Sequence, residues 1–171
     1  TVYKTPMISY QMGVDIEDRM ESLLTEMEPV IETIEDAWAM NNYETVISNV
    51  SLVLKMWDEV GVVLNGSNEF SGLISDADFE EFQNTSLAVY TMFYLLRAES
   101  YFYLEDYIKA VRDYDMAFDS LDRLTDRELS AELLSLLAEE GMDLSLLNTH
   151  RQKAIERRHV YPDKLQLQPI Q

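Results

Sequence analysis

Apolar side chains recur along most of the chain at intervals of three and four residues, which is the spacing of helices that bury one face. Clusters of polar turn formers interrupt this pattern and divide the chain into separate helices. The predicted helices cover approximately residues 20–40, 43–60, 78–103, 107–122, 125–140 and 143–159. Short turns join them in pairs, and Asn41-Asn42 forms the first turn. The pattern therefore predicts an all-α fold of about five to six helices, stacked as antiparallel hairpins.

Residues with known preferences for helix ends refine these boundaries. Asp78 is the expected N-cap of the third helix, because Glu80 and Glu81 follow in its first turn. The fifth helix is expected to begin at Thr125-Asp-Arg-Glu128, which has the spacing of a capping box, and to end before Gly141.

A long connection follows the first hairpin. Residues 61 to about 78 contain many turn formers and no helical stripe. Pro162 is expected to close the last helix. We expect a single helical domain over residues 1–162 and an extended tail over residues 163–171.

Small and aromatic residues recur at helical spacing around the second turn. They are Ala98 and Tyr101 before the turn, and Ala110, Tyr114 and Ala117 after it. This pattern resembles one tetratricopeptide repeat, most clearly over residues 91–122, with Glu105 where the repeat usually has Gly. A weaker copy covers residues 27–58, because Tyr43 lies 64 residues before Tyr107, close to twice the repeat length of about 34. The resemblance implies a tetratricopeptide-like stack of hairpins.

Composition narrows the class of protein. The chain has 171 residues, of which 47% are hydrophobic, and it contains no Cys. This length suits one domain with its own core, and the lack of Cys removes disulfides and thiolate metal sites. No apolar run reaches the roughly 18 residues of a membrane span. The chain does not begin with Met, so we expect a piece of a longer protein, located in the cytoplasm, with the nucleus as the alternative.

Charge restricts the partners. The formal net charge of −19 argues against direct binding of nucleic acid, because phosphates repel an acidic surface. Residues 148–171 are the exception, since this segment contains five Lys and Arg residues and only two acidic residues. One interpretation is that acidic faces are solvated and the basic residues complement a helix dipole. The other is that this segment, or a similar segment of a partner, folds onto an acidic surface, which includes self-association.

Catalysis and metal binding have little support in the sequence. His150 and His159 are both expected on the surface of the charged C-terminal helix, where they form no His-based triad or His-rich metal site. The acidic run at 76–81 lacks the Gly and the distal Glu of a calcium loop. We therefore predict a protein that is not an enzyme and that has no metal and no cofactor.

The resemblance to tetratricopeptide repeats also implies a partner-binding groove, lined by the first helix of each hairpin. The implied groove residues are Ile31, Glu35, Trp38 and Asn42 in the first hairpin, and Leu95, Glu99, Phe102 and Asp106 in the second. Carboxylates beside aromatic and aliphatic side chains suit a protein segment that carries Lys or Arg next to apolar anchors. The alternative is that the aromatic residues belong to the core and the glutamates are merely solvated.

The leading hypothesis is a non-catalytic interaction module, an adaptor or scaffold, that docks a basic and apolar segment of a partner protein or of its own chain. The alternative is an acidic chaperone for a basic client, similar to acidic histone chaperones or bacterial secretion chaperones. Strong salt sensitivity of binding favours the alternative. The family also captures the C-terminal carboxylates of chaperones with Lys and Asn, but this chain has Ile31 and Glu35 there, so we do not expect that mode.

Overall fold

The computed structural model describes residues 6–65 and 75–159, with side chains over 18–62 and 75–159. This part of the chain is all-α, without strands, as the apolar pattern predicts. Its helices are α1 (Pro6–Ala39), α2 (Tyr43–Asn65), α3 (Asp76–Tyr103), α4 (Tyr107–Arg123), α5 (Arg127–Glu139) and α6 (Leu144–Arg158). No helix in the described part is both long and apolar enough to cross a membrane.

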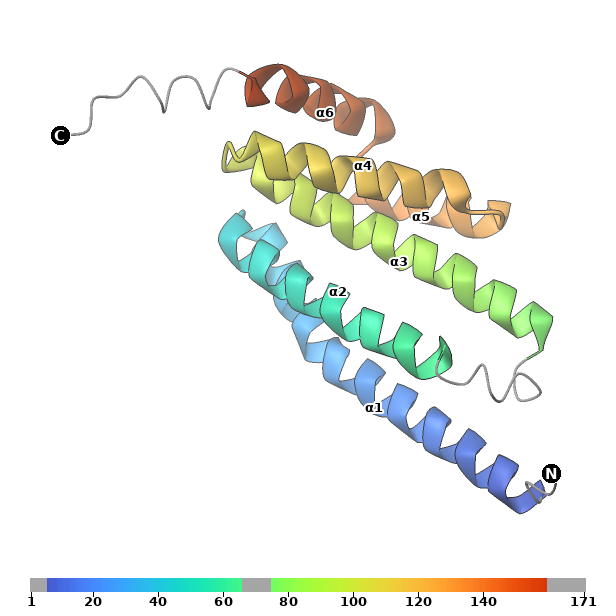
Figure 1. Cartoon of the computed structure of the whole chain (residues 1–171). Helices are drawn as coiled ribbons and strands as arrows, with labels where there is room; N and C mark the ends of the chain where they lie inside the picture. Colours follow the sequence, from blue (N-terminus) through green and yellow to red (C-terminus); the bar gives the residue numbers. More distant parts are fainter. Residues whose placement is uncertain (1–5, 66–74, 160–171) are drawn as a thin grey trace.

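The helices form a stack in which neighbours in sequence are mostly neighbours in space (Figure 1). α1 packs on α2, α2 on α3, and α3 on α4. α5 contacts α3, while α6 packs mainly on α4 and also reaches α3. α1 lies at one edge of the stack and has no comparable contact with any helix besides α2 among the described residues.

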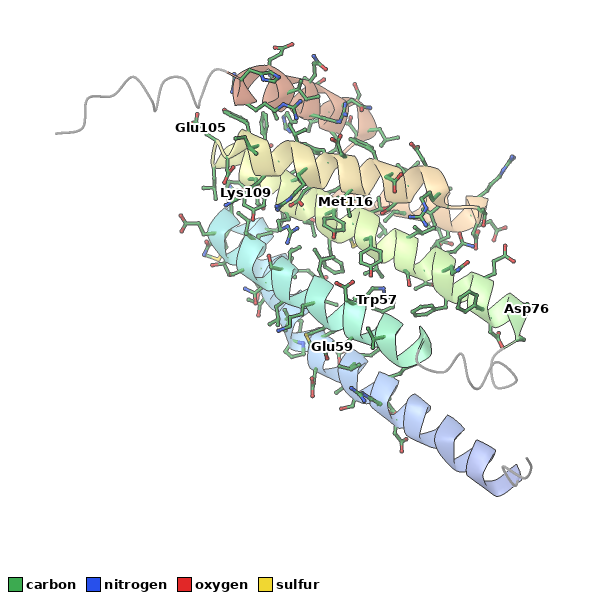
Figure 2. The ribbon with its side chains drawn as sticks, viewed as in Figure 1. Trp57, Glu59, Asp76, Glu105, Lys109 and Met116 are labelled. Atoms are coloured by element: carbon green, nitrogen blue, oxygen red, sulfur yellow. The ribbon has the colours of Figure 1, made fainter. Side chains whose placement is uncertain are left out.

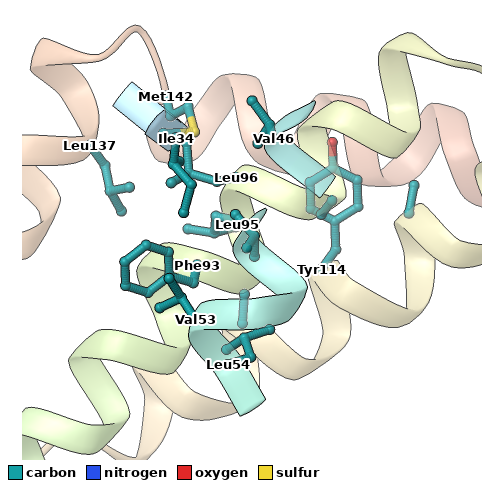
Figure 3. Packing of buried hydrophobic residues seen from close by; sticks show 14 of the residues in the cluster. Ile34, Val46, Val53, Leu54, Phe93, Leu95, Leu96, Tyr114, Leu137 and Met142 are labelled. Carbon is teal, nitrogen blue, oxygen red and sulfur yellow. The ribbon is translucent and has the colours of Figure 1, made fainter. Parts of the chain in front are cut away.

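One core cluster connects the helices of this stack (Figure 3). Val53 and Leu54 of α2 meet Phe93 and Leu95 of α3 in it, and Tyr114 of α4 is fully buried beside them. The small residues that carry the repeat pattern, Ala98, Ala110 and Ala117, are also fully buried. Since a buried Leu or Phe side chain contributes about 1.5–3 kcal/mol, this cluster is the main source of stability.

The three turns that follow α1, α3 and α5 share one backbone geometry. Asn41, Glu105 and Gly141 each have a positive φ, of 55°, 64° and 80° respectively. The amide that follows each of them donates to a carbonyl five residues earlier, as in a Schellman motif. These bonds run from Asn42 to Ala37 (2.8 Å), from Asp106 to Tyr101 (2.9 Å) and from Met142 to Leu137 (2.8 Å). The first two turns are therefore equivalent, as their 64-residue separation predicts, and the third turn matches them although its sequence carries little of the repeat pattern.

Glu105 occupies a left-handed backbone position that favours Gly (Figure 2). A left-handed conformation costs a residue with a Cβ about 1–2 kcal/mol, and Gly avoids this cost. Part of the gain, about 0.4–1 kcal/mol, is lost because Gly makes the unfolded chain more flexible. We therefore expect Glu105→Gly to raise the free energy of unfolding by about 0.5–1 kcal/mol. Chemical denaturation measures the change, and Glu105→Ala is the control because it keeps the Cβ. Equal stability of the two variants would contradict the strain at this turn.

Several helix ends differ from the predictions. α1 begins at Pro6 rather than near residue 20, and α2 continues to Asn65, so the connection is shorter than predicted. The N-cap of α3 is Ser75, not Asp78. The Ser75 hydroxyl accepts a bond from the Asp78 amide (3.1 Å) and donates to the Asp78 carboxylate (2.8 Å). The Ser75 hydroxyl thus bonds to both the amide and the carboxylate of Asp78, which is the third residue of the helix.

The N-cap of α5 is Asp126 and not Thr125. Thr125 instead ties this turn to α3, because its hydroxyl accepts a bond from the Asn84 side-chain amide (3.1 Å). The last turn of α5 ends before Gly141, as predicted, and Asp143 caps α6. Pro162, the predicted tail over 163–171 and residues 66–74 of the connection lie outside the described residues.

Candidate protein-binding surface

The four groove residues expected in the first hairpin lie at or near the surface. Ile31 and Trp38 are half-buried on α1, whereas Glu35 and Asn42 are exposed. Asn42 also accepts a bond from the Thr45 amide (3.3 Å), so part of its role is to cap α2. This set remains accessible to a partner.

Three of the four residues expected in the second hairpin are inside the protein. Leu95 is fully buried, Glu99 is 1% exposed and Phe102 is 9% exposed. The prediction that they line an open groove is wrong, because α4 and α6 cover this face of α3. The fourth residue, Asp106, is half-buried and caps α4 by accepting a bond from the Lys109 amide.

Glu99 is the centre of a buried polar cluster. The Tyr114 hydroxyl donates a short hydrogen bond to its Oε1, and the His150 Nδ1 lies 2.8 Å from the same oxygen. The His150 ring stacks on Phe102, with centroids 4.3 Å apart. Burial and the nearby Glu99 charge raise the pKa of Tyr114 above its usual value. His150 is buried, so the expectation that it lies on the surface is also wrong. The cluster joins α3, α4 and α6 through these three side chains.

The basic C-terminal helix combines both interpretations of its charge. Arg151 of α6 pairs with Asp115 of α4 (2.8 Å), and Arg157 donates to the Tyr107 hydroxyl (2.9 Å). α6 thus packs on α4 of its own chain, where Arg151 meets an acidic side chain. Arg157 and Arg158 also stand in the last turn of α6, where they complement the helix dipole.

The accessible face of α1 has a regular arrangement of apolar and acidic side chains. Leu24, Ile31 and Trp38 follow one another at seven-residue spacing, and Glu21, Glu28 and Glu35 do the same three positions earlier. We call these six residues the α1 surface. Its apolar row becomes more open toward the N-terminal side, where Leu24 is 46% exposed. A shallow hollow of about 420 Å³ lies there, lined by Met20, Glu21, Leu24, Thr25 and Glu28.

The carboxylates of the α1 surface are not neutralised by their surroundings. Glu21, Glu28 and Glu35 are all exposed. None of them forms an ion pair with a side chain in the part of the chain that the structure describes. The surface therefore presents three charges of one sign beside an apolar row.

A series of aromatic rings extends the α1 surface onto the neighbouring helices. Trp38 meets the edge of Tyr43 of α2 (6.0 Å between centroids), and Tyr43 stacks on Tyr103 of α3 (4.9 Å). Burial, followed by the charge of Glu99, raises the pKa of both tyrosines, so they remain neutral at physiological pH. The apolar row thus ends in a neutral aromatic corner at the first turn.

A second hollow, of about 640 Å³, lies between α2, α3 and α4. Its lining includes Phe82, which stacks on Trp57 (5.7 Å), and Met116 of α4. Trp57 and Met116 are labelled in Figure 2. The acidic residues that line this second hollow already have partners. Asp58 accepts a bond from Tyr90 (2.6 Å), and Asp119 faces Arg123 (3.7 Å). The second hollow is therefore less suited to a basic partner than the α1 surface.

The sequence contains a signal for the α1 surface that the repeat comparison did not use. That comparison selected one residue per helical turn, so it included Ile31, Glu35 and Trp38 but not Glu21, Leu24 or Glu28. The seven-residue repeat of both rows is visible in the sequence. No comparable signal marks the buried partners of Glu99, because His150 lies 51 residues away.

No group of three or more His, Cys, Asp or Glu side chains within the described ranges is arranged to hold a metal ion. Comparison of the chain with protein-family models, with curated proteins and with solved structures gives no match. Membership of the tetratricopeptide family therefore stays a prediction.

Proposed function

We propose that the protein is a non-catalytic interaction module, an adaptor or scaffold of tetratricopeptide-like hairpins, that docks a basic and apolar segment of another protein on the α1 surface. The observation that carries the proposal is the pair of parallel rows on α1. Three carboxylates that form no ion pair within the described residues stand beside Leu24, Ile31 and Trp38. A Lys or Arg side chain gains from the carboxylates, while apolar anchors gain from the adjacent row.

Charge favours a basic partner over other occupants. The chain carries a formal net charge of −19, and α6 already uses part of the basic C-terminal segment within the protein. An acidic ligand at the α1 surface would meet three like charges. The pair of Arg151 and Asp115 is an internal example of a basic side chain of one helix held by a carboxylate of another.

A set of charge reversals tests the location of binding. The probe is a fluorescent peptide of Lys, Leu and Ala, and the variant is Glu21→Lys/Glu28→Lys/Glu35→Lys. An exposed ion pair contributes about 0.2–1 kcal/mol, and reversal adds repulsion of similar size, so we expect the Kd to rise about tenfold to hundredfold. Fluorescence anisotropy measures the Kd. The matched control reverses Glu132, Glu139 and Glu140, which are also exposed and produce the same change in net charge.

Equal weakening by both triple variants would contradict the proposal, because binding would then follow net charge rather than the α1 surface. A salt series from about 0.05 to 0.5 M separates the two hypotheses about function. An adaptor with apolar anchors retains most of its affinity at high salt, whereas an acidic chaperone for basic clients loses it. Trp38 provides a local readout in a Trp57→Phe background, since its emission shifts when a ligand covers it.

A further inference from the structure

α1 has more apolar rows than its one neighbour covers. Two rows at seven-residue spacing pack toward α2 in the core, and their members are Met20, Met27 and Ile34, and Leu23, Val30 and Ala37. The third row, of Leu24, Ile31 and Trp38, lies about 60° around the helix axis from the first. Ile31 and Trp38 of the third row pack partly against the same core, and Leu24 is 46% exposed, so the row keeps an open edge that a second helix can contact. Among the described residues, α2 is the one helix that packs extensively on α1.

We infer that the partner segment is a single α-helix that lies along α1, with apolar residues in heptad spacing and Lys or Arg at the flanking positions. This inference rests on the proposed function and names the class of partner. The flanking row Glu21, Glu28 and Glu35 keeps the same seven-residue spacing as the apolar row. In paired helices, residues that flank the apolar seam choose the partner by their charge. Three Glu there select a basic helix.

The geometry sets the length of this helix. From Glu21 to Trp38 the helix rises about 26 Å, at 1.5 Å per residue, which corresponds to about two and a half heptads. At the far end, the partner meets the aromatic corner of Trp38, Tyr43 and Tyr103. At the near end, it meets the hollow beside Leu24. A helix of about 18 residues therefore covers the whole α1 surface.

Other occupants fit less well. An extended segment gains most of its affinity by hydrogen bonding to a sheet edge, and the described part of the chain has no strand. A second copy of the chain would bring its own Glu21, Glu28 and Glu35 against the same residues, and like charges across an interface oppose association. A basic helix meets neither obstacle.

Two peptides of identical composition test the inference on the full chain. The first has about three heptads, with Leu at both seam positions and Lys at the flanking positions. The second contains the same residues in an order without heptad spacing. We expect the heptad peptide to bind at least about tenfold more tightly and to gain helical circular dichroism on binding. Leu24→Ser, at an exposed position, should weaken the heptad peptide about fivefold without unfolding the protein.

Each outcome decides a different question. If both peptides bind equally and the α1 charge reversals weaken both, the proposed function stands and the helical partner is refuted. If neither peptide binds, the proposed function fails and the inference fails with it. A dimer of the protein that the α1 reversals dissociate or strengthen, measured by analytical ultracentrifugation, would show that a second copy occupies the surface and would also overturn the inference. A peptide with Glu at the flanking positions should bind only the reversed variant.

Discussion

Asp113→Ala is expected to lower the free energy of unfolding by about 3–5 kcal/mol. Asp113 of α4 is 0% exposed and accepts two bonds from Arg97 of α3, from Nε at 2.6 Å and from Nη2 at 3.0 Å. Arg97 also donates to the Ser51 hydroxyl of α2 (3.0 Å), so one guanidinium joins three helices. Removal of the carboxylate leaves a largely buried positive charge without its partner, which is the costly way to break such a pair. Urea denaturation measures the change.

The control for this variant is the exposed pair of Asp119 and Arg123, whose side chains are 69% and 67% exposed. Asp119→Ala should change stability by less than about 0.5 kcal/mol. A second variant separates charge from packing. Arg97→Met/Asp113→Leu removes both charges, so it should cost less than Asp113→Ala alone. If Arg97→Met/Asp113→Leu is less stable than Asp113→Ala, the ion pair itself stabilises the fold. The loss of stability in Asp113→Ala would then not come from the unpaired charge of Arg97.

Glu99→Ala is expected to cost about 3 kcal/mol and to loosen α6. The substitution removes the acceptor shared by Tyr114 and His150, and both of these side chains are buried. α6 buries few apolar side chains, chiefly Leu147 and Ala154, so the cluster is a large part of its attachment. We therefore expect the amides of α6 to exchange with solvent faster than those of α2.

Hydrogen exchange with mass spectrometry measures this difference, and urea denaturation gives the total loss. Glu99→Gln is the matched variant, since it keeps an acceptor for Tyr114 and a similar volume, and its cost should be about 1 kcal/mol. Unchanged protection of α6 in Glu99→Ala, together with a global loss of stability, would show that the cluster holds α3 to α4 and not α6 to the stack.

The sequence predicts the helix pairs well because the relevant signals are local. Apolar spacing and the turn at Asn41-Asn42 locate the first hairpin, and the equivalent turn at Glu105 has the same backbone shape. Helix ends are less certain where two neighbouring residues are both suitable caps. Ser75 and Asp78 are such a pair, and in the structure Ser75 is the cap while its hydroxyl also bonds to the Asp78 carboxylate. Asp126 and Thr125 are another, and Thr125 is drawn away by Asn84 of α3.

The candidate site was only half predictable, for a physical reason. Helical spacing shows which residues share a face, but it does not show what covers that face. Ile31, Glu35 and Trp38 stay at least partly accessible because, within the described ranges, α1 packs extensively on α2 alone. Leu95 and Glu99 have the same pattern, but they are buried, and Glu99 contacts Tyr114 of α4 and His150 of α6. Burial of a glutamate also depends on partners such as Tyr114 and His150, which spacing alone does not identify.

Because α1 lies at the edge of the stack, binding of a ligand on its surface should also make this helix more stably folded. In a linear array, each unit is held by the units beside it, so a terminal unit with a single interface frays at a lower free energy than the whole array unfolds. A ligand that adds a second interface suppresses this fraying by about 2.7 kcal/mol when its concentration is a hundred times the Kd. Among the described residues α1 packs extensively on α2 alone, so it is the element whose persistence depends most on what is bound beside it.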